Sequence, residues 1–378
     1  MKGIKNALCQ AKGFEAAAMA AGLKKNNQFD LALIYTDVPA VSCGMFTKNR
    51  FAAAPVIICK EHLKAKQSQA IVVNSGNANC YTGVAGLKVA KETARVAAEL
   101  LGIKNNAVLV SSTGIIGKLL DISKIAHAVP FLVKSLNTNG GQKVARAIMT
   151  TDTKPKEAVA KIKIGNSGVT IGAVAKGAGM IAPDMATMLC FITTDAAIEY
   201  AALKEALRDA VDTSFNMITI DGCMSTNDSV IILANGMAKN TVIRLADAQF
   251  LKFKTALKEI CLSLAKMIVQ DAEGATKFIT IEVSGAGNNA EAKKAALAIA
   301  NSNLFKTAVY GQGQNWGRII AAIGASGVKA KERIKLQYSS FKKKNIVVKA
   351  DLGCGVGKAT VYTSDLTPEY VRINAEYN

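Results

Sequence analysis

Histidine, aromatic residues and long apolar runs are scarce in this 378-residue chain, and each shortage excludes a class of protein. His62 lies in the charged stretch EHLKAK and His127 in SKIAHAVPFL, so we interpret both as surface or packing residues. No G-x-S-x-G motif is present, and a catalytic triad built on histidine is therefore not expected. If the chain activates a hydroxyl group, its base is something other than imidazole.

The chain contains no run of 18 apolar residues, which argues against a membrane-spanning helix. Its first 25 residues lack the continuous apolar core of a secretion signal. The eight cysteines stand singly, with no C-x-x-C pair, and most have apolar neighbours, as reduced core cysteines do. This pattern argues against a disulfide framework or a zinc site and favours a reducing compartment. We therefore expect a cytoplasmic protein without a zinc site.

Basic residues are in large excess, with 47 Lys and Arg against 28 Asp and Glu, a net charge of +19. Such a charge attracts acidic metabolites or nucleic acid. The lysines are scattered, however, with Lys342–Lys344 as the longest run, and aromatic residues make up only 6%. No helix-turn-helix, zinc-finger or RNA-recognition pattern is visible. A solvated basic face is the preferred interpretation, and no nucleic-acid partner is expected.

Apolar periodicity predicts alternating strands and helices, and hence a mixed α/β protein with several layers of sheet and helix. Neither a low-complexity linker nor a fixed-period repeat divides the chain. The expected strands are 30–37, 70–74, 107–111, 278–283, 346–350 and 359–363, and the expected helices are 83–101, 199–211, 246–269 and 290–300.

Three stretches rich in Gly, Ser, Thr and Asn are expected to form loops after strands: NSGNAN (74–79), SSTGIIG (111–117) and KGAGMIAPDMATML (176–189). Loops of this composition turn backbone N–H groups into a cavity, where they bind phosphate or form an oxyanion hole. The chain has neither a P-loop nor a G-x-G-x-x-G motif opening a helix. The glycine-rich stretch 353–357 leads back into a strand, so a nucleotide site is not expected.

Thr187 stands among apolar residues and directly after the small residue Ala186. A threonine can act as a nucleophile without histidine if the peptide bond before it is broken. Its own α-amine, with an ordinary pKa near ~8, then takes the hydroxyl proton. The residues alone leave two interpretations open, a nucleophile released by cleavage and an ordinary β-branched strand residue near a turn.

Several collinear motifs resemble the ornithine acetyltransferase family, the ArgJ proteins of arginine biosynthesis. The resemblance covers essentially the whole chain. Its motifs include NSGNANCYTG, SSTGIIG, AIMTTDTKPK (147–156), KGAGMIAPDMATML, STND (225–228), DAEGATK (271–277), NWGRIIAA and YVRINAEY (370–377). So many motifs in one order make the match highly specific.

The resemblance implies a precursor that cuts itself between Ala186 and Thr187 into chains of residues 1–186 and 187–378. It implies an α/β fold like that of the self-processing DmpA-type aminopeptidases, with β-sheets sandwiched between helices, and assembly as an α2β2 heterotetramer. The new N-terminal threonine would move an acetyl group from N2-acetylornithine to glutamate by a ping-pong mechanism, which requires no cofactor and no metal. Some members of the family also acetylate glutamate from acetyl-CoA, and no residue here decides whether this chain does so.

The resemblance also assigns site residues. Thr187 would be the nucleophile, while the Thr113 hydroxyl and the Gly114 N–H would donate hydrogen bonds to the oxyanion. The substrate-binding positions that it implies are Thr153, Lys176, Thr187, Glu273 and Asn374. Because the substrates are amino acids, we hypothesise that Lys176 binds an α-carboxylate and Glu273 the ornithine side-chain ammonium.

Some positions depart from the family pattern. Ala182 and Asp184 replace a histidine and an asparagine ahead of the nucleophile, which we expect to slow self-cleavage while leaving Thr187 in place. Cys223 replaces an aspartate before STND, and Gly313-Gln314 replace Asp-Pro before NWGR. The family's Thr-Thr or Thr-Ser ending is missing after Asn378, so a terminal substrate contact is not expected. The alternatives are an amidohydrolase or aminopeptidase with the same N-terminal nucleophile, and an inactive, uncleaved basic binding protein.

Overall fold

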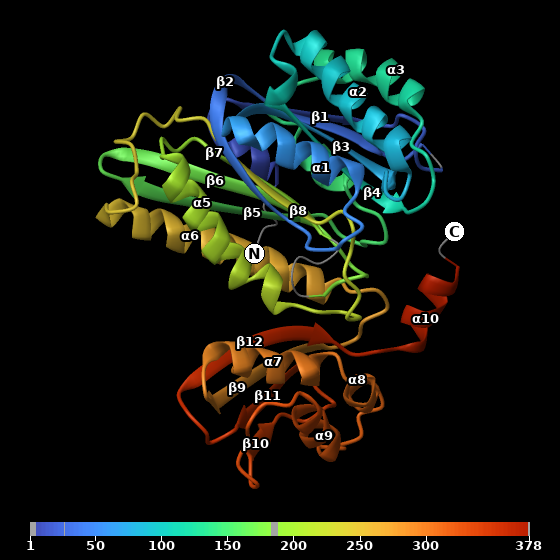
Figure 1. The fold of residues 1–378 in the computed structure, drawn as a ribbon, viewed down its shortest axis with the longest axis vertical. Helices are drawn as coiled ribbons and strands as arrows, with labels where there is room; N and C mark the ends of the chain where they lie inside the picture. The colour runs from blue at the N-terminus through green and yellow to red at the C-terminus, as the bar shows by residue number, and fades with distance from the viewer. Residues whose placement is uncertain (1–4, 26, 183–187, 377–378) are drawn as a thin grey trace.

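A large mixed β-sheet and a smaller one, each covered by helices, make up the computed structural model, which describes residues 5–25, 27–182 and 188–376 (Figure 1). This is the α/β architecture, with sheets flanked by helices, that the sequence predicts. The strands are β1 (Phe14–Met19), β2 (Leu31–Phe46), β3 (Gln67–Asn77), β4 (Val108–Ile115), β5 (Lys156–Ile164), β6 (Ser167–Lys176), β7 (Leu189–Thr194), β8 (Ser229–Ala234), β9 (Phe278–Ala286), β10 (Lys335–Tyr338), β11 (Asn345–Asp351) and β12 (Gly357–Ser364).

Some of the helices begin at a residue whose side chain caps the first turn. Asp121 caps one helix by accepting a hydrogen bond from Ser123 N, and Thr367 caps another by accepting from Tyr370 N. The helices are α1 (Ala54–His62), α2 (Gly83–Leu101), α3 (Ile122–Lys134), α4 (Gly141–Ala147), α5 (Tyr200–Asp212), α6 (Ala248–Gln270), α7 (Asn289–Ala300), α8 (Asn303–Tyr310), α9 (Gly317–Ala325) and α10 (Pro368–Ala375).

The large sheet has the strand order β4-β3-β2-β8-β7-β6-β5, with β1 added against β2. The pairs β3–β4 and β7–β8 are parallel, and the other neighbours are antiparallel. The long strand β2 connects the two halves, because it pairs first with β3 and then with β8. The sheet thus joins segments on both sides of residues 183–187.

The centre of the large sheet is buried on both faces. In β7, Leu189 and Phe191 join the apolar cluster shared with α1 to α4. Cys190 and Ile192, on the opposite face, join the cluster that contains α5 and α6. Every residue of β7 and β8 is buried, and strands in this position have nearly continuous apolar sequences without alternation.

The smaller sheet, in the order β10-β11-β9-β12, packs with α7, α8 and α9 around a third apolar cluster. Figure 1 shows this unit below the large sheet, with α5 and α6 between them. After β12 the chain leaves the unit and forms α10 beside it. Hydrogen bonds from Tyr370 to Asp221 and from Asn374 to Glu273 then connect α10 to residues outside the small sheet.

The predicted helix at 83–101 is confirmed, and the predicted helices 199–211, 246–269 and 290–300 lie within two residues of α5, α6 and α7. The six predicted strands are also present. The predicted end of a strand at Asp37 is wrong, because β2 continues to Phe46. An irregularity between Tyr35 and Ala40, where Pro39 lies, interrupts the pairing with β3 without ending the strand.

Two of the stretches expected as loops are largely strand, which corrects the sequence interpretation. β3 continues to Asn77 and β4 to Ile115, so NSGN and SSTGI pair with each other in parallel. The pairing places Gly76 opposite Gly114, both with positive φ (94° and 134°). Glycine adopts these angles without steric cost, and the ladder therefore continues through residues whose composition is typical of loops.

Both histidines are packing or surface residues, as expected. His62 is buried with Nδ1 2.7 Å from Val108 O, and His127 is exposed on α3. All eight cysteines are free thiols, and burial raises the pKa of Cys59 to about 12. Among the described helices, none is both long and apolar enough to cross a bilayer.

Candidate functional site

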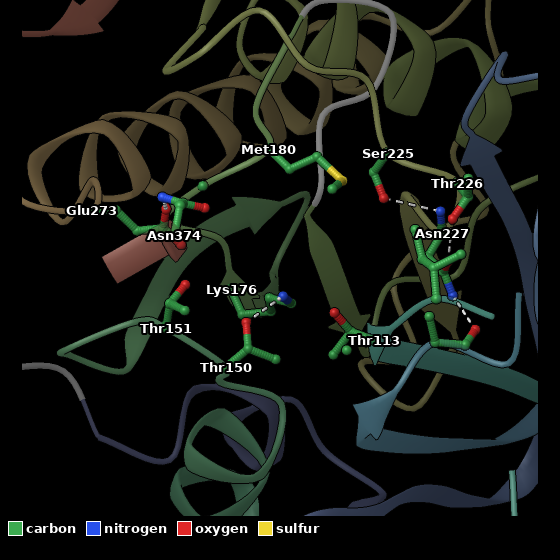
Figure 2. A pocket seen from close by; sticks show the side chains of 14 residues that line it. Thr113, Thr150, Thr151, Lys176, Met180, Ser225, Thr226, Asn227, Glu273 and Asn374 are labelled. Carbon is green, nitrogen blue, oxygen red and sulfur yellow. Dashed lines mark hydrogen bonds between the residues drawn. The ribbon is translucent and has the colours of Figure 1, made fainter. Parts of the chain in front are cut away.

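Residues from separate parts of the chain line one cavity, here called the central cavity (Figure 2). Strand ends contribute part of the lining, at β3, β4 and β6 and in the segments before β7 and β8. The rest comes from helices and the segments next to them, namely the segment after α4, the end of α6, and α10. The lining residues are Ala78, Thr113, Gly114, Ile116, Thr150, Thr151, Lys176, Gly179, Met180, Ser225, Thr226, Asn227, Glu273 and Asn374. Five of the sequence-predicted residues are therefore brought together.

Thr113 and Gly114 lie near the end of β4, in the parallel ladder with β3. A Cβ atom on Gly114 would lie 2.3 Å from the Gly76 carbonyl carbon, so no other residue fits between these strands. The Thr113 hydroxyl, although 3% exposed, has no hydrogen-bond partner among the described residues. It is available to donate to a ligand oxygen in the cavity.

Lys176, the last residue of β6, places its ammonium group in the cavity between the other lining groups (Figure 2). Its side chain is 2% exposed, and Nζ donates to Thr150 Oγ1 at 2.9 Å. Burial lowers the pKa of Lys176, while the carboxylate of Asp152 acts in the opposite direction. One hydrogen bond leaves two ammonium hydrogens for a ligand, so this buried cation suits an anionic group.

Glu273 and Asn374 form the opposite side of the cavity, at the left of Figure 2. Glu273 follows α6 and is 8% exposed, and its Oε2 accepts a hydrogen bond from Asn374 Nδ2 at 2.7 Å. A Cβ atom on Gly179 would come within 2.5 Å of the carboxylate oxygens, so the absence of a side chain there makes room for them. An anion therefore faces the cation of Lys176 within one cavity.

Thr153 does not line the central cavity. Its backbone N donates to Asp271 Oδ2 at 3.0 Å, and its hydroxyl donates to Oδ1 of the same carboxylate. Asp271 also pairs with the buried Lys156 at 2.7 Å, and Lys156 pairs with Asp152 at 2.6 Å. The threonines of this motif that line the cavity are Thr150 and Thr151.

The sequence analysis assigned no role to Ser225, Thr226 and Asn227, which line the side opposite Glu273 (Figure 2). Asn227 Nδ2 donates to Ala78 O at 2.6 Å and to Ser112 O at 2.8 Å, which fixes the ends of β3 and β4 relative to β8. The available signal was the STND motif itself, a run of polar residues directly before an apolar strand.

Ala186 and Thr187, the predicted cleavage site and nucleophile, lie outside the described residues, as does Asp184. The first described residue after them is Met188, whose N donates to Asp228 Oδ1 at 3.1 Å. Asp228 is fully buried, and its Oδ2 has no hydrogen-bond partner in the described structure. Burial raises the pKa of Asp228 well above its usual range.

Asp221 holds the segment before residue 183. Its carboxylate accepts hydrogen bonds from Met180 N at 2.6 Å and from Ile181 N at 3.0 Å. The Tyr370 hydroxyl donates to the same carboxylate at 3.1 Å. Met180 has a φ of 54°, a left-handed conformation that is unfavourable for a residue with a side chain. The bonds to Asp221 stabilise that conformation at the edge of the cavity.

The family model described as the ArgJ family matches residues 15–342 of this chain. The "Arginine biosynthesis bifunctional protein ArgJ" of Geobacter sulfurreducens is 46% identical, over 97% of this chain and 99% of that protein. The protein of the same name from Symbiobacterium thermophilum is 45% identical, over 97% and 96%. The chain therefore spans nearly the full length of these relatives.

Among solved structures, the arginine biosynthesis bifunctional protein of Bacillus halodurans is 37% identical (TM-score 0.46), over 48% of this chain and 94% of its own. Ornithine acetyltransferase from Mycobacterium tuberculosis, solved in complex with ornithine, is 35% identical (TM-score 0.43), over 47% and 94%. An L-aminopeptidase from Ochrobactrum anthropi is 12% identical (TM-score 0.43), over 72% and 89%.

Proposed function

The chain belongs to the ArgJ family of arginine biosynthesis, and on that premise we propose that it transfers an acetyl group from N2-acetylornithine to glutamate through an acetyl-threonine at Thr187. The observation that carries the proposal is the central cavity. It combines two candidate oxyanion donors, a buried cation and a buried anion, contributed by distant parts of the sequence. These are the groups that acyl transfer between amino acids needs.

Self-cleavage between Ala186 and Thr187 prepares the nucleophile, giving chains of residues 1–186 and 187–378. In the uncut chain the nitrogen of Thr187 belongs to an amide and cannot accept a proton. After cleavage it is an amine with an ordinary pKa near ~8 and is the base closest to the threonine hydroxyl. The described structure is compatible with a cut, because Asp221 holds residues 180–181 and Asp228 holds Met188 independently of the intervening bond.

In the first half-reaction the Thr187 hydroxyl oxygen attacks the acetyl carbonyl carbon of N2-acetylornithine, and its proton passes to the Thr187 amine. The Thr113 hydroxyl and Gly114 N–H donate to the resulting oxyanion, and a donor of this kind contributes ~3 kcal/mol to transition-state stabilisation. The amide C–N bond then breaks, the leaving nitrogen takes the proton, and ornithine departs.

In the second half-reaction the amine of glutamate attacks the acetyl-threonine ester through the same oxyanion. The glutamate nitrogen loses a proton to the Thr187 amine, the C–O bond breaks, and this proton passes to the threonine oxygen as N-acetylglutamate leaves. Lys176 would bind an α-carboxylate in both halves, and Glu273 would bind the side-chain ammonium of ornithine, with Asn374 fixing the Glu273 carboxylate. Thr153, through Asp271 and Lys156, lies in a network beside the cavity, where its proposed part is to support the substrate site.

Assembly of the cleaved chains as an α2β2 heterotetramer in the cytoplasm completes the proposal. The eight free cysteines support the choice of a reducing compartment. Acetyl-CoA is proposed as a second acetyl donor to the same threonine, which would make the enzyme bifunctional, as the names of its relatives state for those proteins.

The testing experiment measures the denatured intact mass of the purified protein beside a Thr187→Ala variant. We expect two fragments from the wild type, the second beginning at Thr187, and a single chain from the variant. A wild-type protein that stays whole would overturn the self-cleavage and favour the uncleaved binding protein.

A second assay separates acetyl transfer from hydrolysis. The cleaved enzyme is incubated with N2-acetylornithine, with and without glutamate, and free ornithine and N-acetylglutamate are measured. We expect ornithine release to depend on glutamate and to match the N-acetylglutamate formed. Ornithine release that ignores glutamate would identify the amidohydrolase alternative.

A further inference from the structure

A second, larger cavity of about 540 Å³ lies beside the central cavity and shares Thr150 with it. Its walls include Leu23, Lys24, Lys25, Ile115 and Lys118, and we call it the lysine cavity. Ile115 follows Gly114 directly, so the lysine cavity begins next to the proposed oxyanion donors. A ligand long enough to reach both cavities would place one end at Thr113 and Gly114 and the other among the lysines.

The segment that carries Lys24 and Lys25 is held in place by backbone contacts. The buried carboxylate of Asp30 accepts hydrogen bonds from Ala21 N at 2.6 Å, Leu23 N at 2.6 Å and Lys24 N at 2.9 Å. Gly76 lets the segment approach β3, because a Cβ atom there would lie 2.9 Å from Leu23 O. This wall of the cavity is therefore preorganised.

Lys24 supplies a fixed positive charge to the cavity. Its ammonium donates to three backbone carbonyls, Phe29 O at 3.1 Å, Ala147 O at 3.2 Å and Met149 O at 2.6 Å. Burial lowers the pKa of Lys24 to about 8, so the group is mostly charged at neutral pH. Its three hydrogens are used, and it acts on a ligand through its charge and by fixing the segment before Thr150.

Lys25 and Lys118 are exposed, and neither forms an ion pair within the described residues. The backbone of Lys118 is fixed by Asn77 Nδ2, which donates to its carbonyl at 3.0 Å. The acidic side chain on the wall, Glu376, already pairs with Arg372 at 3.1 Å. Arg372 also pairs with Glu369, so it offsets the charge of Glu376 only in part. The lining carries three ammonium groups against one carboxylate, and this excess of positive charge attracts a ligand with several negative charges.

We propose that the lysine cavity binds the phosphate groups of an anionic ligand through Lys25 and Lys118. One source of such phosphates is an acetyl thioester that carries them, such as acetyl-CoA, with its acetyl group in the central cavity; this source rests on the proposed function. The thioester carbon would then bond to the Thr187 oxygen, the C–S bond would break, and the thiol would leave with the threonine proton. The other source is a free phosphorylated metabolite that occupies the cavity beside the reaction.

The test compares the wild type with a Lys25→Gln/Lys118→Gln double variant in glutamate acetylation by three donors. Acetyl-CoA carries phosphates, whereas S-acetyl-N-acetylcysteamine is a thioester without them and N2-acetylornithine has neither phosphate nor thioester. In the double variant we expect KM for acetyl-CoA to rise about tenfold or more, because at least one charge-assisted contact with a phosphate is lost. The other two donors should be unaffected. A Lys252→Gln/Lys358→Gln variant, with exposed lysines on α6 and β12, is the matched control.

Binding of inorganic pyrophosphate, measured by calorimetry on the same proteins, distinguishes the two sources. If the wild type binds pyrophosphate and the Lys25/Lys118 variant does not, the phosphate site is supported. If the enzyme also uses N2-acetylornithine but not acetyl-CoA, the ligand of this site is a free phosphorylated metabolite. Equal acetyl-CoA kinetics and equal pyrophosphate binding in wild type and variant would overturn the proposal. If no acetyl group is transferred from N2-acetylornithine, the proposed function is refuted instead. The calorimetry would still show whether the lysine cavity binds phosphate.

Discussion

Glu273 is the residue whose proposed role depends most directly on charge. Its carboxylate faces the central cavity and is fixed by Asn374 Nδ2 at 2.7 Å. Glu273→Gln keeps an oxygen for that hydrogen bond and removes the charge. We expect KM for N2-acetylornithine to rise by roughly tenfold to a hundredfold, because one charged contact with the substrate is lost. Self-cleavage should change little. Steady-state kinetics and the extent of cleavage measure the two effects.

Glu273→Ala, which also removes the partner of Asn374, should raise KM at least as much and still leave cleavage nearly intact. Equal damage to cleavage and to substrate binding in both variants would contradict an ornithine-binding role. Glu369→Gln on α10, where Glu369 pairs with Arg372 on the surface, is a suitable control for the loss of a carboxylate near this part of the molecule.

Asp228 is a buried carboxyl group whose titration should affect stability. Burial raises its pKa above the value near ~3.9 expected in the unfolded chain, so the folded state binds its proton more tightly. The stability that this contributes is fully present below the unfolded pKa and is lost as pH rises through the folded pKa. Asp228→Asn removes the titration and keeps an oxygen for Met188 N.

We therefore expect the melting temperature of the wild type, relative to Asp228→Asn, to fall as the pH is raised from about 4 to about 7. Differential scanning calorimetry across this range measures the difference. Both proteins should carry Thr187→Ala, so that cleavage does not change the chain being melted. Melting temperatures that run parallel over the whole range would show that Asp228 has no raised pKa.

At the scale of elements, the parallel contact of β3 with β4 shapes the proposed oxyanion site. A Cβ atom on Gly114 would lie 2.3 Å from Gly76 C and 2.5 Å from Asn77 N, both of them backbone atoms that cannot move independently. Gly114→Ala should separate the two strands and displace the Gly114 N–H. We expect kcat to fall by about 10²–10³, the usual effect of losing one oxyanion donor.

Gly117→Ala is the control for this change. Gly117 also has a positive φ, of 84°, but a Cβ atom there would have nothing within 4 Å. The Gly117→Ala change should lower the stability of the folded state through backbone strain and leave kcat nearly unchanged. Transferase rates and melting temperatures of the two variants measure the contrast, and a similar kcat for both would argue against an oxyanion role for Gly114.

At the scale of the whole molecule, the proposed cut falls between strands that remain paired. β6, before residue 187, pairs with β7, after it, within the large sheet. β2 pairs in the same way with β8. Each half would expose apolar strands on separation, so the two fragments should behave as one folded unit.

We expect the cleaved chains to elute together in native size-exclusion chromatography and to separate only in denaturant. Thr187→Ala, uncut, should elute at the same volume as the cleaved wild type. Fragments that separate in native buffer would show that the sheet does not hold the two halves together.

The sequence by itself determined which helices form where apolar residues recur with helical period, as in 83–101, because that signal is local to one segment. Its ordered motifs also determined the family and the residue types available for chemistry. It did not identify β7 and β8. Their short apolar runs, like those of β3 and β4, have no alternation, and such a run is not distinguished by periodicity from a segment of a buried helix. Nor did the sequence show that NSGN and SSTG continue their strands, since their pairing joins residues far apart in the chain.

The tertiary structure decided how these residues are used. It placed Thr150 and Thr151 in the central cavity and tied Thr153 to Asp271, 118 residues away. It also buried Asp228, and this burial, not the residue type, raises its pKa. The physical reason is that burial, charge and hydrogen-bond partners come from segments that meet only when the sheet has formed, whereas sequence patterns report on neighbours along the chain.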